Sequence, residues 1–144
     1  MGYTHYFTQL RDCTPDEWEH LSIRANIVLQ TARKLGIDVG NGLGEPGSYP
    51  EVDADEIWFN GIGSAGYETF GIKRTLPAPG GFCKTNKNAY DPVVTAILIL
   101  ANIYAPGVWN IRSDGRRADW MAGLKLIQDQ IACKESDIPD QVRS

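Results

Sequence analysis

The sequence has few of the residues that build disulfides, metal centres and membrane spans. Three cysteines, Cys13, Cys83 and Cys133, are scattered over 144 residues, and two histidines accompany them. An odd number of widely spaced cysteines predicts neither a disulfide framework nor a zinc site, so we expect reduced, packed thiols and no metal or cofactor. The longest apolar run, residues 93–101, is far shorter than the roughly 20 residues that span a bilayer, which predicts no membrane contact.

Targeting signals are also missing from the chain. The N-terminus has no basic region followed by an apolar one, which predicts a cytoplasmic protein without a secretory signal. Hydrophobic residues make up 42% and charged residues 22% of the chain, which is ordinary for a globular protein. We expect one domain over residues 1–144, folding alone or as a small homo-oligomer, with a frayed tail over residues 135–144.

Positive charge is scarce overall but concentrated in one part of the chain. The net charge of −4 argues against general nucleic-acid binding. Residues 1–70 hold four Lys/Arg against eleven Asp/Glu, whereas residues 71–117 hold seven against two. Such asymmetry is typical of an anion-binding face, and it fits a dispersed, solvated surface equally well.

Hydrophobic periodicity and turn signals predict a mixture of strands and helices. A Thr14-Pro15-Asp16-Glu17 capping box opens the first helix, and a glycine-rich link joins two strands of a hairpin. The predicted order is strand (paired on both sides), helix, hairpin, helix, strand and helix, over residues 3–10, 15–35, 56–74, 92–103, 108–113 and 118–133. Residues 37–39, in the long loop after the first helix, also suit one further short strand. This order predicts an α+β domain with an antiparallel or mixed sheet of about four strands and three helices, one of them central and buried.

The stretch over residues 82–103 joins a polar, cationic loop to the helix that we expect at the centre. Asp91 is placed to cap this helix with its carboxylate, and Pro92 suits its first turn. The loop carries Lys84 and Thr85 but not the Gly-Lys-Thr core of a P-loop. Because Asp91 would oppose an anion at the helix N-terminus, we expect the loop itself to hold any anionic ligand.

No catalytic signature stands out. The glycine-rich link has the spacing of a dinucleotide fingerprint, but a strand pattern follows it instead of a helix, which argues against a Rossmann site. Ser113 lacks a nucleophile elbow, which argues against a Ser-His-Asp triad with His5. A hydrolase that uses His5, Glu68 or Asp114 stays an alternative.

Several short blocks lie along most of the chain: Gly2-Tyr3-Thr4-His5-Tyr6, Phe59-Asn60-Gly61, Glu68-Thr69-Phe70, Phe82-Cys83-Lys84-Thr85, Tyr90-Asp91, Ser113-Asp114-Gly115 and Asp119-Trp120. Together they resemble a family of small uncharacterised proteins of tailed bacteriophages. In that family a His often precedes the Glu-Thr-Phe block, where this chain has Tyr67. The resemblance implies a phage origin and expression in the cytoplasm of the host bacterium, and it supplies no activity.

Small phage proteins without a catalytic signature often act by binding. We therefore expect a counter-defence or accessory protein that sequesters a phosphate-bearing small molecule, such as a nucleotide immune signal, without catalysis. One alternative is an inhibitor that contacts a host defence protein through the acidic first half, and another is a small phosphodiester or glycosidic hydrolase. Phe82 and Tyr90 suit either base stacking or the sealing of the core. The expected ligand-binding residues are His5, Asn60, Phe82, Lys84, Thr85, Tyr90, Arg112, Ser113 and Asp114.

Overall fold

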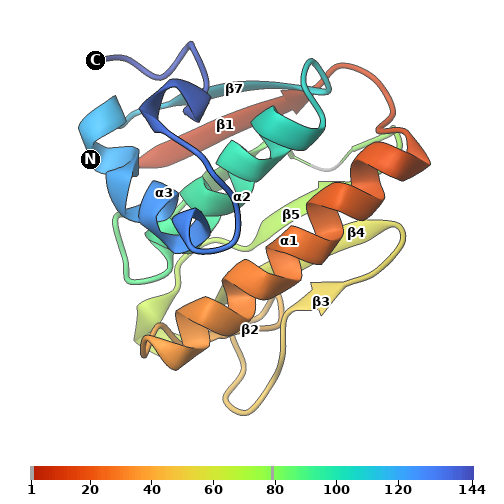
Figure 1. The fold of residues 1–144 in the computed structure, drawn as a ribbon. Coiled ribbons are helices and arrows are strands. Elements are labelled where there is room, and N and C mark those ends of the chain that lie inside the picture. The colour runs from red at the N-terminus through yellow and green to blue at the C-terminus, as the bar shows by residue number, and fades with distance from the viewer. Residues whose placement is uncertain (1, 79) are drawn as a thin grey trace.

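Strand β1 (Thr4–Gln9) is the middle strand of a three-stranded antiparallel sheet in the computed structural model, which describes residues 2–78 and 80–144. Strands β6 (Phe82–Lys84) and β7 (Trp109–Ser113) pair with its two edges (Figure 1). The first strand is therefore confirmed, including its pairing on both sides.

A second antiparallel sheet is built around β4. Its strands are β2 (Val39–Gly40), β3 (Glu51–Val52), β4 (Glu56–Gly61) and β5 (Phe70–Lys73). Strands β4 and β5 form the predicted hairpin, and a short 3-10 helix (Gly63–Ala65) occupies the link between them. The Glu68 N–H donates to the Lys84 carbonyl, so the chain that enters β5 runs beside β6 and brings the two sheets edge to edge.

Helix α1 (Pro15–Lys34) begins where its capping signal predicts. The Thr14 hydroxyl accepts the Glu17 N–H, and the Glu17 carboxylate accepts the Thr14 N–H. Two of the N–H groups that a helix start leaves without partners are thereby satisfied. The sequence therefore specifies this helix start locally.

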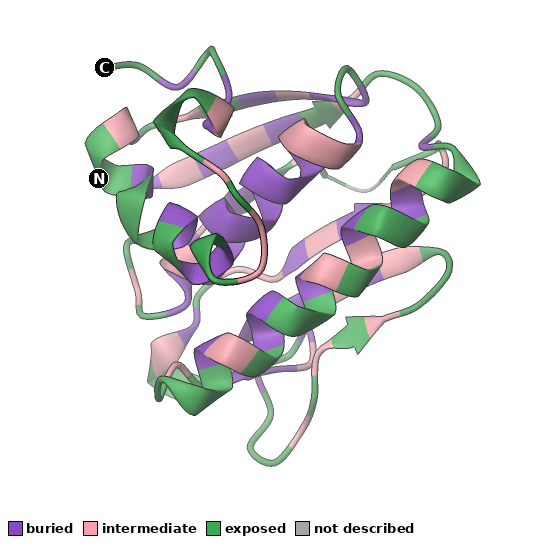
Figure 2. Ribbon diagram, viewed as in Figure 1, coloured by how far each residue is buried: buried purple, intermediate pink, exposed green. Residues whose placement is uncertain are grey.

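Helix α2 (Asp91–Tyr104) is the centre of the core, as predicted. Its residues from Val93 to Ala101 are all buried, and α1 and α3 (Met121–Gln128) pack against it (Figure 2). Gly123 allows α3 to approach closely, since a Cβ there would lie 2.8 Å from the Ala96 nitrogen and 2.9 Å from the Pro92 oxygen. Helix α2 is therefore scaffold covered by other elements.

The helices cover one face of the strands and leave the opposite face open (Figures 1 and 2). On β1, His5 and Phe7 are buried, whereas Tyr6 and Thr8 point to the other side and keep contact with solvent. The same alternation runs along β5 and β7. Because side chains alternate across a strand, the register decides which residues share the open face.

Two expectations about the strands are corrected. Residues 82–84 form strand β6 instead of the start of a loop, because their backbone pairs with β1. In the described residues the chain forms seven strands in two sheets instead of one sheet of about four. Strand β2 overlaps at Val39 with the short strand expected over residues 37–39, whereas β3, with two residues, is too short to show a periodic pattern.

The last helix and the tail also differ from their predictions. Residues 117–120 form a 3-10 turn, and α3 ends at Gln128 instead of reaching residue 133. The tail, expected to fray, is held against the domain, because Ile138 and Val142 are buried in the core. The Arg117 guanidinium adds hydrogen bonds to tail carbonyls, including that of Ile138 at 3.1 Å.

The sequence predicts no membrane contact, and the helices of the described residues can be compared with that prediction. None of them combines the length and the apolar character that crossing a bilayer requires.

Candidate functional site

The nine expected binding residues are divided between the two faces of the sheet. Those that point into the protein are His5, Thr85, Tyr90 and Ser113, and those on or beside the open face are Phe82, Lys84, Arg112 and Asp114. Asn60 lies at the end of β4. The structure therefore does not bring all nine into one site.

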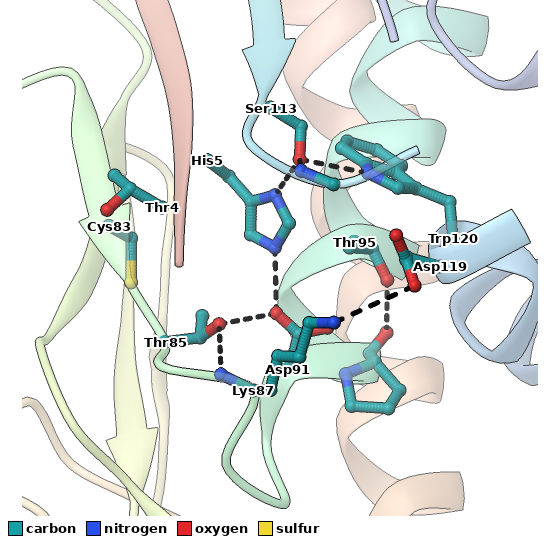
Figure 3. A network of polar contacts seen from close by, with 12 residues as sticks. Thr4, His5, Cys83, Thr85, Lys87, Asp91, Thr95, Ser113, Asp119 and Trp120 are labelled. Carbon is teal, nitrogen blue, oxygen red and sulfur yellow. Dashed lines mark hydrogen bonds and ion pairs between the residues drawn. The ribbon is translucent and has the colours of Figure 1, made fainter. Parts of the chain in front are cut away.

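Three of the inward residues, His5, Thr85 and Ser113, form a buried polar network with Asp91 (Figure 3). His5 Nδ1 lies 2.8 Å from the Ser113 hydroxyl oxygen, and His5 Nε2 lies 2.7 Å from Asp91 Oδ1. The Thr85 hydroxyl donates to the same Asp91 oxygen. The rings of Tyr3 and Trp120 meet the imidazole edge to face, at centroid distances of 5.1 and 5.2 Å.

Counting donors and acceptors assigns the tautomer of the neutral His5 ring. The Ser113 oxygen accepts the Gly115 N–H at 2.9 Å and the Trp120 Nε1–H at 3.3 Å, which uses both of its lone pairs. Its own hydrogen is therefore donated to His5 Nδ1. Nε2 then carries the ring proton and donates it to Asp91.

Ser113, His5 and Asp91 thus stand in the order of a hydrolytic triad, although Ser113 lacks an elbow motif. Unlike the residues of an active site, these residues are not accessible to a substrate. His5 is fully buried, the Ser113 oxygen has no free lone pair, and neither large hollow of the described chain is lined by these residues. What the geometry supports is a structural role, tying β1 and β7 to the start of α2.

Asp91 does not cap α2 with its carboxylate, which corrects that prediction. Tyr90 is the residue at the cap position and makes no side-chain capping bond. The Asp91 carboxylate instead serves His5 and Thr85, where two buried polar groups need an acceptor.

Tyr90 and Cys83 are sealed in the core beside this network. The Tyr90 hydroxyl donates to the Glu68 carbonyl at 2.6 Å, and burial raises the pKa of this phenol. Burial also raises the pKa of the Cys83 thiol to about 12, which leaves it protonated and unreactive. Of the two rings considered for base stacking, the fully buried Tyr90 has no free face for a ligand.

Asn60 organises the hairpin link instead of facing a ligand. Its side-chain oxygen accepts the N–H groups of Gly61 and Tyr67, and its amide donates to the Tyr67 carbonyl at 3.0 Å. Tyr67 is thereby held where the chain leaves the glycine-rich link. The Phe59-Asn60-Gly61 block is therefore explained by the hydrogen bonds that Asn60 makes in this turn.

A hollow of about 420 Å³ opens on the face of the strands that no helix covers, between β4 and β5 of one sheet and β6 of the other. Trp58, Tyr67 and Phe82 provide its aromatic walls, and Tyr67 and Phe82 are 50% and 52% exposed. Gly71 pairs with Trp58 across the strands, and a Cβ on Gly71 would collide with the indole ring. Gly71 therefore lets the indole lie against the sheet as one side of the hollow.

Sequence reasoning did not identify Trp58 and Tyr67 as site residues. The signal that points to Trp58 is strand alternation, because Ile57 and Phe59 on either side of it are buried. Tyr67 carries no comparable signal, since it lies in the link before β5. Its position depends on the Asn60 hydrogen bonds.

Charged groups stand at the edges of this open face. The Lys84 ammonium lies 5.4 Å from the centre of the Tyr67 ring, and the Arg112 guanidinium lies 5.1 Å from that of Tyr6. Both distances suit cation–π contacts. The opposing carboxylates have backbone partners: Glu68 accepts the Lys84 N–H at 2.7 Å, and Asp114 accepts the Thr4 N–H at 3.0 Å.

A larger hollow, of about 500 Å³, lies between α1 and the turn from β3 to β4. Trp18, Ile23 and Val52 line it with apolar surface. Its carboxylates are Glu19, Asp53 and Asp55, with Arg74 as the cation. The excess of negative charge makes this hollow unsuited to a phosphate.

The described residues contain no group of three or more His, Cys, Asp or Glu side chains arranged to hold a metal ion.

Comparison with known proteins returned no match to a family model, a curated protein or a solved structure. The tailed-phage resemblance therefore stays a prediction from short sequence blocks.

Proposed function

We propose that this protein binds and sequesters a phosphate-bearing small molecule with a planar ring, such as a nucleotide immune signal, without catalysis. The observation that carries the proposal is the aromatic hollow with Lys84 at its edge. Half-exposed Tyr67 and Phe82 offer ring surface that a bound base would remove from water.

The size and chemistry of the hollow support this ligand class. Its volume of about 420 Å³ lies within the 300–1,000 Å³ typical of small-molecule sites. Aromatic walls bind any base through its π face, and a lysine ammonium attracts a phosphate. The combination favours a nucleotide over a purely apolar ligand.

The biological role follows from the sequence resemblance. A tailed phage that expresses this protein in the host cytoplasm would use it to lower the free concentration of a host defence signal. Such a role needs stoichiometric binding and no turnover. His5, one of the three residues considered for a hydrolytic alternative, is buried on the other face from Glu68 and the hollow.

Calorimetric titration with mononucleotides, cyclic nucleotides and ADP-ribose tests the proposal. We expect saturable binding of at least one ligand, weakened roughly five- to 150-fold by Phe82→Ala through the loss of a stacking ring. Lys84→Ala is expected to weaken phosphate-bearing ligands, whereas Lys125→Ala, which removes an exposed lysine on α3, serves as the matched control.

Two outcomes would contradict the proposal. Absence of binding across the whole panel removes the ligand class. Chemical conversion of the ligand during incubation, detected by chromatography, replaces sequestration with catalysis.

A second candidate is direct contact with a host defence protein through the larger hollow between α1 and the turn from β3 to β4, which we call the α1 groove. The observation that favours it is an apolar surface at Trp18 and Ile23 beside the carboxylates of Asp53 and Asp55. Such a groove suits a basic, partly apolar segment of a partner.

Pull-down from host lysate with matched variants tests this second candidate. Ile23→Asp, in the groove, should abolish capture of a stoichiometric partner, whereas Ile27→Asp, exposed on α1 outside the groove, should not. Association is expected to weaken with salt because charges contribute. Equal capture by both variants would exclude the groove as the contact surface.

A further inference from the structure

We infer that the binding site extends from the aromatic hollow across the open face to Tyr6 and Arg112. Its ligand then carries two planar rings joined through a phosphodiester, as in a dinucleotide. This inference rests on the proposed function, because the hollow takes the first ring.

Strand register puts three side chains in one row beside the hollow. Phe82 on β6 pairs with Tyr6 on β1, and Tyr6 pairs with Arg112 on β7. All three belong to the set of strand positions that face away from the helices. Since adjacent strands lie about 4.8 Å apart, the row from Phe82 to Arg112 spans about 10 Å.

Phe82 belongs to both parts of the proposed site. Its ring lines the hollow and is 52% exposed, and its cross-strand neighbour is Tyr6. Cross-strand neighbours have Cβ atoms about 5 Å apart, so the Tyr6 side chain stands next to the Phe82 wall of the hollow. A ligand with one ring in the hollow can therefore continue along the row.

Tyr6 and Arg112 have the features of a second ring and phosphate position. The Tyr6 hydroxyl donates to Asp114 at 3.3 Å, and the Arg112 guanidinium lies over the ring at 5.1 Å, so both restrain the tyrosine. Arg112 is exposed and takes part in no ion pair within the described residues. Its charge is therefore available to a phosphate.

The alternation of groups matches that of a dinucleotide. Lys84 lies two positions from Phe82 on β6 and its ammonium is near the Tyr67 ring, whereas Arg112 lies at the end of the row over the Tyr6 ring. Each ring position thus has one cation beside it, as a 5′-phosphorylated dinucleotide has one phosphate for each base. The Asp114 and Glu68 carboxylates oppose an anion close to them. The phosphates consequently belong beside the tips of the two cations, one at each.

The position of the row in the sheet limits the length of the ligand. Strand β7, which carries Arg112, is an outer strand of the order β6-β1-β7, so the row ends there. The net charge of −4 supplies no wider attraction for a long polyanion. Two nucleotides are therefore expected to fill the site.

Calorimetry on the full chain with 5′-mononucleotides and the corresponding 5′-phosphorylated homodinucleotides tests the inference. We expect a dinucleotide to bind about tenfold or more tightly than its mononucleotide, since one further stacked base strengthens binding by that order. Arg112→Ala and Tyr6→Leu should remove this gain and leave mononucleotide affinity unchanged. Thr8→Ala, at the next outward position of β1, is the matched control and should change neither.

The outcomes separate the inference from the proposed function. If mononucleotides bind but dinucleotides bind no better, or if Arg112→Ala weakens both alike, the second position is overturned and the hollow stands. A tetranucleotide that binds far more tightly than a dinucleotide overturns the limit of two rings. Absence of binding by every nucleotide overturns both proposals, and Arg112→Ala, at an exposed position, keeps the test valid if Tyr6→Leu fails to fold.

Discussion

At the scale of single residues, Asp91 is the acceptor on which the buried polar network depends. One of its oxygens accepts from His5 on β1 and from Thr85, the residue that follows β6. A buried donor that loses its acceptor costs more than the net strength of one hydrogen bond. Substitutions at this position should therefore separate the role of the oxygen from that of its charge.

We predict that Asp91→Leu lowers the free energy of unfolding by about 2–6 kcal/mol, because two buried donors lose their acceptor at about 1–3 kcal/mol each. Asp91→Asn keeps an oxygen at the same place and should cost about 1 kcal/mol. Urea unfolding of both variants measures the difference. Equal losses would show that the site requires the carboxylate charge, which contradicts the prediction that an acceptor oxygen at this place is enough.

Glu17 supplies the clearest pH dependence in the chain. Its hydrogen bonds with Arg11, helped by the N–H of Thr14, lower the carboxyl pKa from 4.5 to about 2. A lowered folded-state pKa means that the charged form stabilises the fold above about pH 4.5, and that this contribution disappears as the pH falls toward 2.

We predict that Glu17→Gln lowers the Tm by a few degrees at most at pH 7, because the ion pair is near the surface. The difference from the natural chain should shrink below pH 4.5 and vanish near pH 2. Thermal unfolding monitored by circular dichroism at a series of pH values measures it. A difference that grows as the pH falls would contradict the sign of the pKa shift.

At the scale of elements, local signals specify where helices begin better than where they end. The start of α1 depends on Thr14 and Glu17, which are close in sequence. Helix α3 ends before its apolar pattern does, because residues beyond Gln128 lead into the tail that returns to the core. The close packing of α3 on α2 depends on one glycine.

We predict that Gly123→Ala destabilises the protein by about 1–3 kcal/mol, the usual cost of overpacking. In an open helix the same change would stabilise by about 1 kcal/mol, but here the Cβ would meet the backbone of α2 at Ala96 and Pro92. Ala122→Gly, exposed on the same helix, is the control for propensity alone. Denaturant unfolding decides the sign, and a stabilised Gly123→Ala variant would contradict the close approach.

At the scale of the whole molecule, the tail completes the core. Ile138 and Val142 are buried although they lie in a segment with little regular structure. Burying each such side chain contributes about 1.5–3 kcal/mol. The domain therefore depends on its last residues more than their polar composition predicts.

We predict that deletion of residues 135–144 lowers the free energy of unfolding by about 3–6 kcal/mol, which is an upper range because unfolded chains already bury some surface. Ile138→Ala should account for a large part of the loss. Gln141→Ala, exposed in the same segment, should have no effect. Thermal unfolding measures all three, and an unchanged Tm after deletion would support the frayed tail.

The sequence predicted which residue types belong to the site, but it did not predict on which face of the sheet each side chain lies. Phe82, Lys84 and Arg112 were named as binding residues, and they share the open face. His5, Thr85, Tyr90 and Ser113 have equally polar or aromatic side chains but point inward. Residue type alone does not distinguish the two groups, because strand register decides the face.

The sequence by itself determined the α+β class, the start of α1, the hairpin and the buried central helix. Each depends on capping, turn residues or periodicity over a few neighbouring positions. The tertiary structure alone decided that His5 meets Ser113 and Asp91, which lie 108 and 86 residues away, and that Trp58 and Tyr67 join Phe82 around one hollow. These contacts arise from strand pairing and helix packing between segments that are distant in the sequence. Patterns over a few neighbouring residues therefore do not predict them.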